Sequence, residues 1–326
     1  LQIQSNHIQM SYYFMFVILF FVGAYFEDAY KKKELPHFFK ASGVLALAAV
    51  VGVCINISNL YHTYEYSKET MRGKSELKQE GAAASQTSSG LDRDYITNWS
   101  YGIGETLTLL VPNVKGGGSG STMSQSEAAM AKANPMYNGI YSQLPQYFGE
   151  QPWTAGPVYV GAFVMFLFVL GCFIVKGPLK WALLGATIFS ILLSWGKNFM
   201  GLTDFFIDYV PMYNKFRAVS SILVIAEFTI PLLAIFALKE ILSKPDMLKQ
   251  EKNCRGVIAA LVLTAGVALI LAVAPGTFFS SFITTQEMTA LKQALPAEHL
   301  APFVANLTEM REAIIASDAW RSFFII

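Results

Sequence analysis

The sequence predicts an all-α polytopic membrane protein with about six complete transmembrane helices, the start of a seventh and a large extracytoplasmic loop region. Six stretches of roughly twenty residues are largely apolar, and a helix needs about 20 residues to cross a hydrocarbon core about 30 Å thick. Lys and Arg concentrate in alternate gaps between these stretches. Charged residues make up 14% of the chain, whereas soluble domains carry about 25%.

The apolar stretches give the spans in order. The six expected spans are residues 10–25, 41–60, 158–175, 181–195, 220–238 and 257–274. A seventh begins at Trp320 and reaches the last residue, Ile326. The domain organisation that follows is two spans over 1–60, a loop region over 61–156, a four-span bundle over 157–275, a helical hairpin over 276–318 and the truncated span over 319–326.

The charge pattern predicts the orientation. Three short gaps are basic, and their cations are Lys31, Lys32, Lys33, Lys40, Lys176, Lys180, Lys239, Lys244, Lys249, Lys252 and Arg255. The gap 276–318 holds only Lys292 and Arg311. Because cytoplasmic loops carry the excess of Lys and Arg, the basic gaps are expected in the cytoplasm and the long loops outside it.

Composition excludes several classes of function. The net charge of +1 offers no basic face of the kind that nucleic-acid binding requires. Cys54, Cys172 and Cys254 are scattered without a CxxC pair, so neither structural zinc nor a disulfide framework is expected. We identify no cofactor, and the spacing of His and carboxylates does not support a metal site.

Both termini of the sequence suggest an internal fragment of a larger membrane protein. Residue 1 is Leu, and the last residues stop inside an apolar run. Composition also predicts flexible linkers at 81–90 and 116–122, which are rich in Gly, Ser and Ala. Pro296 is the expected turn of the hairpin over 276–318.

Two glutamates are candidates for acid–base chemistry. Glu105 lies next to Gly104, and Glu150 follows Gly149, so the backbone at both positions could approach a ligand closely. A carboxylate at the membrane edge can act as a general base on a hydroxyl group. The alternative for Glu105 is a charge at a helix N-terminus, where the macrodipole favours it.

A polar segment near the predicted outer surface is the candidate anion site. Lys197, Lys215 and Arg217 flank Asp204 and Asp208, which are four residues apart and share a helical face. Arg binds phosphate oxygens bidentately, so these cations could hold a lipid-linked phosphate. The alternative is that they reach toward lipid headgroups and pair with the aspartates.

Glu227 is a candidate intramembrane polar site because it lies in the middle of the fifth expected span. An ionisable group there is costly unless it faces a polar interior. Pro231 is expected to kink the same helix, and the alternative role of Glu227 is a hydrogen bond between helices. His7, just outside the first span, is a further polar candidate.

Four segments together resemble the YfhO-type bacterial membrane proteins, in particular members from Bacteroidetes. They are NHIQMSYY at 6–13, WSYGIGETLTLLVP at 99–112, YVGAF at 159–163 and VPMYNKFR at 210–217. Gly104 and the pair Ala218 and Val219 stand where that family commonly has Pro. These departures concern the segments that contain Glu105 and Arg217.

The resemblance implies a glycosyltransferase of the GT-C type in the bacterial cytoplasmic membrane. Such enzymes move a sugar from a polyprenyl-phosphate carrier to an envelope glycan or glycolipid, so the implied partners are membrane lipid, the lipid-linked sugar and the glycan acceptor. The catalytic carboxylate of that type usually lies in the first outer loop, which is expected upstream of residue 1. Arg217 and Lys197 would then bind the carrier phosphate, and Glu150 or Glu105 would position the acceptor. The alternatives are a transporter or flippase of lipid-linked sugars, with Glu227 in its pathway, and a non-catalytic scaffold for envelope assembly.

Overall fold

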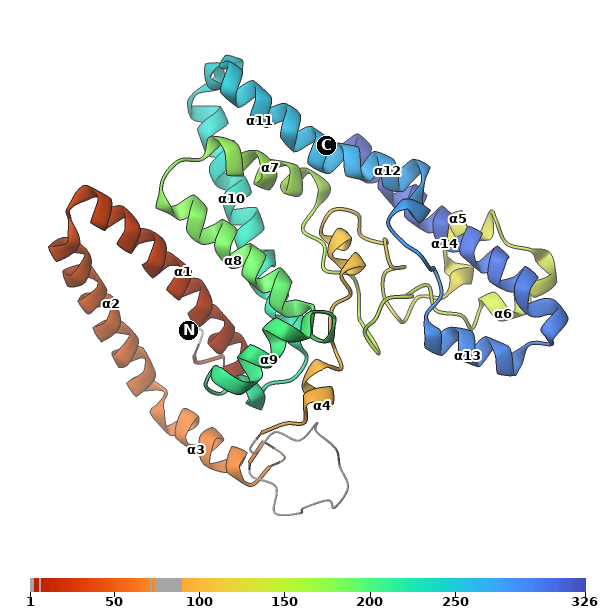
Figure 1. The fold of residues 1–326 in the computed structure, drawn as a ribbon, viewed down its shortest axis with the longest axis horizontal. Coiled ribbons are helices and arrows are strands. Elements are labelled where there is room, and N and C mark those ends of the chain that lie inside the picture. The colour runs from red at the N-terminus through yellow and green to blue at the C-terminus, as the bar shows by residue number, and fades with distance from the viewer. Residues whose placement is uncertain (1–2, 6, 71, 74–89) are drawn as a thin grey trace. The chain divides into compact units, whose positions relative to one another are not determined.

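The computed structural model describes residues 3–5, 7–70, 72–73 and 90–326. This part of the chain is helical, with an isolated antiparallel bridge between Thr122 and Pro145. It forms two compact units, each built from two separate stretches (Figure 1). Unit 1 comprises Leu1–Tyr101 and Lys176–Thr229, and unit 2 comprises Gly102–Val175 and Ile230–Ile326.

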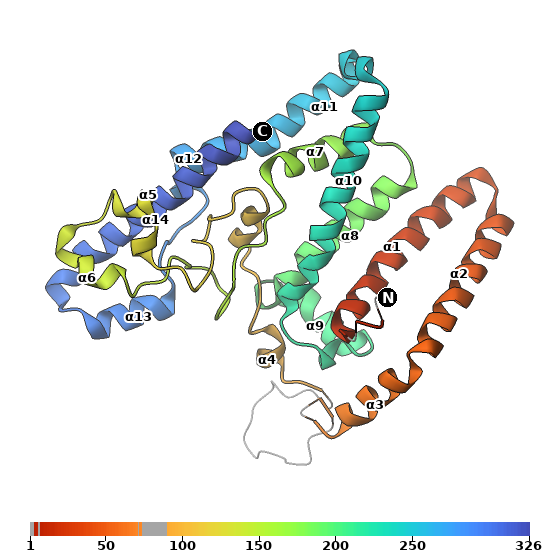
Figure 2. The same ribbon diagram turned by 180° about the vertical axis from the view of Figure 1, so that it is seen from behind.

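In unit 1, α1 (Ile8–Lys32) and α2 (Leu35–Ile55) form an antiparallel hairpin (Figure 2). The turn is tight because Lys33 adopts the left-handed conformation at φ 60° and its N–H bonds to the last turn of α1, while Pro36 lies in the first turn of α2, where a missing N–H costs nothing. Asn56 interrupts the helix, and α3 (Ile57–Lys68) follows.

The second half of unit 1 is a bent helix pair. α8 (Pro178–Ser194) packs along α1 and then turns by 107° into the segment Gly196–Tyr209, which contains α9 (Met200–Tyr209). The short helix α4 (Arg93–Thr97) and the 3₁₀ turn Val219–Leu223 complete the core. Its buried members include Tyr13, Val17, Ile96, Ala186, Leu193, Ile207, Tyr213 and Ile222.

The apolar helices of unit 2 are α7 (Ala162–Ile174), the later part of α10 (Val224–Ser243), α11 (Glu251–Leu261) and α12 (Val267–Val273). A π-helical turn, Val262–Gly266, joins α11 to α12. The buried hydroxyl of Thr264 within it donates to the carbonyl of Ala260 at 2.7 Å. The two helices therefore count as one span, Glu251–Val273.

The rest of unit 2 is a layer of short helices against a long hairpin. The layer contains the 3₁₀ turns Gly104–Leu109, Met123–Gln125 and Pro135–Tyr137, with α5 (Glu127–Met130) and α6 (Asn138–Tyr141). The hairpin consists of α13 (Thr285–Ala294) and α14 (Ala297–Ile325). Leu295 and Pro296 separate them, at the position of the expected turn.

The membrane class is confirmed, but the count of six spans is not. Four helices are long and apolar enough to cross a membrane, or five if the bent pair of α8 and α9 is one span. The four are Ile8–Lys32, Leu35–Ile55, Val219–Ser243 and Glu251–Val273. The expected third span shrinks to the 13 residues of α7, because the chain enters it through Gly161 at φ 102°. That helix is too short for a straight crossing of about 20 residues.

The apolar run from Trp320 lies in α14, a continuous helix of 29 residues whose buried stripe includes Phe303, Leu307 and Ile314. Residues 116–122 are an ordered segment: Gly116 and Gly117 have φ 82° and 79°, and Ser121 accepts from Gln146 N–H at 2.8 Å. Glycine adopts the positive φ that this turn requires at Gly116 and Gly117 without a steric penalty. The other expected linker, 81–90, lies outside the described residues except for Gly90.

Candidate functional site

The centre of the candidate site is the carboxylate of Glu105, in the 3₁₀ turn Gly104–Leu109 of unit 2. Its residue is only 2% exposed. The hydroxyl of Tyr147 donates to Oε1 at 2.5 Å, and the N–H of Gly102 donates to Oε2 at 2.6 Å. The backbone N–H of Glu150 also bonds to this carboxylate. Burial raises the pKa of Glu105 and the Glu150 charge adds to the rise, while these three donors oppose it.

Two glycines make room for this arrangement. A Cβ on Gly149 would lie 2.0 Å from Oε1 of Glu105 and 2.3 Å from the Tyr147 hydroxyl. A Cβ on Gly102 would lie 3.0 Å from Oε2 of Glu105 and 3.1 Å from Oε1 of Glu150. The two glutamate side chains therefore approach the same backbone position, Gly102, and Glu150 is the exposed member of the pair.

Lys115 supplies a cation beside the two carboxylates. Its ammonium lies over the rings of Phe279, at 4.3 Å from the centroid, and Phe148, at 4.9 Å. Burial lowers the pKa of Lys115, Arg311 lowers it further, and the charges of Glu105 and Glu150 raise it. Cation–π contacts hold the ammonium against the two rings, and its charge interacts with both carboxylates.

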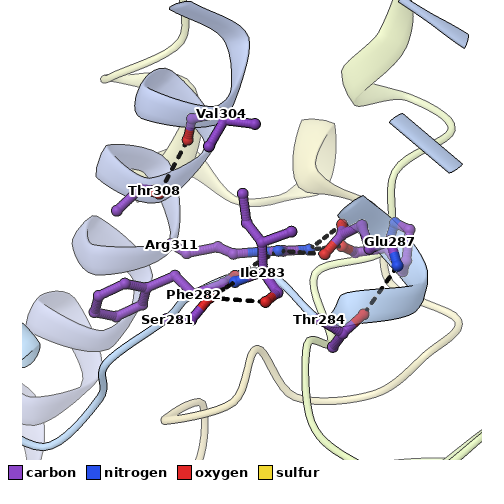
Figure 3. A network of polar contacts seen from close by, with 9 residues as sticks. Ser281, Phe282, Ile283, Thr284, Glu287, Val304, Thr308 and Arg311 are labelled. Atoms are coloured by element: carbon purple, nitrogen blue, oxygen red, sulfur yellow. Dashed lines mark hydrogen bonds and ion pairs between the residues drawn. The ribbon is translucent and has the colours of Figure 1, made fainter. Parts of the chain in front are cut away.

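Arg311, on α14, is the centre of a network of polar contacts with Glu287 and Phe282 (Figure 3). The side chain is fully buried and binds both carboxylate oxygens of Glu287, on α13, at 2.7 Å. It also donates to the carbonyls of Phe282 at 2.6 Å and Pro145 at 3.3 Å. Its guanidinium lies 4.9 Å from the centroid of Phe148, so one residue ties the hairpin to the loop that carries Tyr147 and Glu150.

The site adjoins the end of an apolar span within unit 2. Phe148 and Phe279 belong to the same buried cluster as Ala268, Leu271 and Ala272 of α12. α12 ends at Val273, at the end of the candidate span Glu251–Val273. Glu105, Lys115 and Glu150 thus lie outside the candidate spans but close to where one of them ends.

The expected phosphate-binding cations all lie in unit 1. The Arg217 guanidinium lies 5.5 Å from the Tyr95 ring centroid and 5.9 Å from that of Trp99, and it donates to the Tyr95 hydroxyl at 2.5 Å. Lys215 donates to the carbonyl of Arg72 at 2.6 Å, and burial lowers the pKa of this lysine.

The aspartates expected beside these cations are held by another residue. Asp204 and Asp208 share one face of α9, as their spacing indicates, and both pair with Arg93 of α4, the second at 2.6 Å. Lys197 is exposed, and its backbone N–H bonds to Ser100 Oγ at 2.8 Å. Arg93 had no local signal in the sequence, since it lies 111 residues from Asp204.

The remaining polar candidates, Glu227 and His7, lie in unit 1. Glu227 is an exposed residue of α10, which continues through Pro231 as one helix. His7 caps α1 and accepts from Met10 N–H at 3.3 Å. Among the described residues, three or more His, Cys, Asp or Glu side chains do not gather where they could hold a metal ion.

The fold and the site together define a multi-pass helical membrane protein with a carboxylate–lysine cluster beside the end of one span. No family model, curated protein or solved structure matches this chain. Of the residues that form the cluster, the sequence pointed only to Glu105 and Glu150. Tyr147, Lys115 and Arg311 carried no motif, because their partners come from distant segments.

Proposed function

We propose that this protein transfers a sugar from a polyprenyl-phosphate carrier to a hydroxyl group of an envelope glycan or glycolipid. The observation that carries the proposal is the exposed carboxylate of Glu150 beside the buried carboxylate of Glu105, next to the end of a span. A lipid-linked donor is confined to the membrane, so an acceptor site for it has to lie near the membrane surface.

Glu150 is the group that meets the acceptor. It accepts the proton of the attacking hydroxyl, the oxygen forms a bond to the anomeric carbon, and the bond from that carbon to the carrier phosphate breaks. The carrier leaves as polyprenyl phosphate. General-base assistance of this kind contributes about 10²–10⁴-fold to a rate.

Glu105 and Lys115 set the electrostatics around Glu150. The Glu105 carboxylate is held in place by Tyr147 and backbone N–H groups, so it keeps a fixed position beside Glu150. Lys115 balances the pair from the aromatic side. Both are positioning residues in this scheme, since Glu105 is buried away from an acceptor.

Within unit 1, Arg217 is the proposed contact for a lipid phosphate. A guanidinium has five N–H donors, and the bond to Tyr95 uses one of them. Cation–π contacts with Tyr95 and Trp99 hold the guanidinium in place, and a guanidinium can bind two phosphate oxygens at once. Lys197 and Lys215 would add positive charge to the same unit.

The test is sugar transfer in membranes that contain the protein, supplied with labelled polyprenyl-phosphate sugars. Glu150→Gln should lower the rate by about 10²–10⁴-fold. In a separate binding measurement, Arg217→Ala should weaken the binding of polyprenyl phosphate. Glu127→Gln, an exposed glutamate of α5 in the same unit, is the matched control and should leave transfer unchanged.

Wild-type protein that inserts normally and transfers none of the supplied sugars would overturn the proposal. Movement of the intact lipid-linked sugar across vesicles, lost in Glu227→Gln, would instead establish a transporter. Inactivity in both assays would leave the scaffold as the better interpretation.

A further inference from the structure

A groove runs along the surface of unit 1 between α1 and α8, two helices that lie side by side in both views (Figures 1 and 2). Its volume is about 460 Å³. The lining is apolar and aromatic over most of its length and includes Phe16, Phe20, Gly23, Ala24, Trp181 and Phe189. Glu27 is its acidic member.

Small residues create the hollow. A Cβ on Gly185 of α8 would lie 2.9 Å from the Phe20 ring, so this glycine lets the ring settle against α8. One helical turn further along α1, a Cβ on Gly23 would meet no atom within 4 Å. The space beside Gly23 is therefore open to an added Cβ, and a large side chain there would extend into the groove.

The two ends of the groove differ in character. Phe16 and Phe20, in the body of the candidate span Ile8–Lys32, form the apolar part together with Phe189 of α8. At the other end, Glu27 pairs with Lys31, and the Lys180 ammonium lies 4.7 Å from the centroid of Trp181. The charged end coincides with the end of the span, where lipid headgroups lie.

We propose that this groove binds a phospholipid whose headgroup carries a primary ammonium, such as an ethanolamine phospholipid. One acyl chain lies along Phe16, Phe20 and Gly23. The headgroup ammonium binds the Glu27 carboxylate, because a carboxylate attracts a cation. It lies beside Trp181, whose ring already holds the Lys180 ammonium. The phosphate faces Lys31 and Lys180. The charge order of the groove matches this zwitterion, whereas a purely anionic headgroup would meet Glu27.

The test measures which lipids stay bound. The protein is reconstituted in vesicles of equal ethanolamine and glycerol phospholipid with a small share of polyprenyl phosphate, extracted in mild detergent and analysed for retained lipid by mass spectrometry. We expect the ethanolamine lipid to be enriched by about fivefold over the glycerol lipid, which is the ratio that one partly exposed ion pair supplies.

Three variants separate the contributions of the chain and the headgroup. Gly23→Phe fills the groove and should abolish retention of both phospholipids. Glu27→Gln alters an exposed side chain, so folding is preserved, and it should remove the preference while some lipid remains. Gly52→Phe on α2 is the matched control, because a Cβ there also meets no atom within 4 Å. It should behave as the wild type.

Equal retention of the two phospholipids by the wild type would overturn the proposal, and so would preferential retention of polyprenyl phosphate. Loss of lipid in Gly52→Phe to the same degree as in Gly23→Phe would also overturn it, since the effect would then not belong to the groove. None of these outcomes bears on sugar transfer at Glu150.

Discussion

The hydroxyl of Tyr147 donates a 2.5 Å hydrogen bond to the buried carboxylate of Glu105, from 42 residues further along the chain. The same hydroxyl accepts the N–H of Gln151 at 2.9 Å. One side chain thereby fixes both the carboxylate and the loop that carries Glu150. This bond joins two parts of the candidate site that lie far apart in the sequence, so no local sequence pattern indicates it.

Tyr147→Phe should destabilise the folded protein by about 1.5–3 kcal/mol, the usual contribution of a hydrogen bond to a charged group. The carboxylate of Glu105 would lose one of its donors while staying buried. Thermal unfolding in detergent measures the effect. Tyr209→Phe, at a tyrosine that is 76% exposed, is the control, and equal stability loss in both variants would contradict the role of the bond.

The same variant should change the dependence of stability on pH. The pKa of Glu105 is already raised by burial, so the folded protein holds this proton to higher pH than the unfolded chain, whose pKa is about 4.3. The contribution of Glu105 to the free energy of unfolding is fully present below the unfolded pKa. It is lost as the pH rises through the folded pKa. Without the Tyr147 donor the folded pKa rises further, so the loss should extend to higher pH in Tyr147→Phe than in wild type. Unfolding followed across the acidic range would show identical profiles if the bond had no effect.

Gly149→Ala should be strongly destabilising, by about 3 kcal/mol or more, because overpacking a close contact costs about 1–3 kcal/mol and a polar bond is displaced as well. The added methyl group would overlap Oε1 of Glu105 and the Tyr147 hydroxyl. Gly139→Ala in α6 is the matched substitution, since its Cβ meets no atom within 4 Å. The measurement is the unfolding temperature of each variant. Similar temperatures for Gly149→Ala and Gly139→Ala would contradict the close contact between Gly149 and the Glu105 carboxylate.

Lys115 should react with amine-acylating reagents at lower pH than an exposed lysine does. Burial lowers its pKa, so the reactive neutral amine forms earlier as the pH rises. Peptide mapping of the labelled protein gives the profile for each lysine, with Lys252 of the exposed surface as the internal reference. Coincident profiles for the two lysines would contradict the lowered pKa.

The lowered pKa of Lys115 also predicts how stability varies in the alkaline range. An unfolded lysine titrates near pH 10.4, so this group's contribution is fully present above that value and is lost as the pH falls through the folded pKa. The wild type should therefore gain stability between these two values. Lys115→Met should lack this gain in denaturation followed from neutral to alkaline pH, and an unchanged gain in the variant would contradict the assignment.

Breaking the buried pair of Arg311 and Glu287 from one side should cost about 3–5 kcal/mol, because a charge stays buried without its partner. Arg311→Met leaves the Glu287 carboxylate, and Glu287→Gln leaves the guanidinium. The double variant Arg311→Met with Glu287→Gln should lose less stability than the sum of the two single losses. Additive losses, measured in a double-mutant cycle, would show that the two residues do not act as a pair.

The sequence by itself determined the class of the protein. Apolar stretches around 10–25, 220–238 and 257–274 became parts of span-length helices, because a helix that satisfies its own backbone bonds and shows an apolar surface is what a bilayer accepts. Hydropathy could not count the spans, since Gly161 shortens α7 and the chain turns by 107° after α8. Hydropathy shows which segments are apolar, but backbone geometry determines where each helix begins and ends.

Only the tertiary structure decided the site. Glu105 and Glu150 were visible in the sequence through their neighbouring glycines, but nothing local linked them to Tyr147, Lys115 or Arg311. Arg311 binds Glu287 from 24 residues away and Pro145 from 166 residues away. Hydrophobic patterning follows local chemistry, which a sequence displays directly. A buried polar cluster is assembled by chain packing, and its members become recognisable only when desolvation and distance are known.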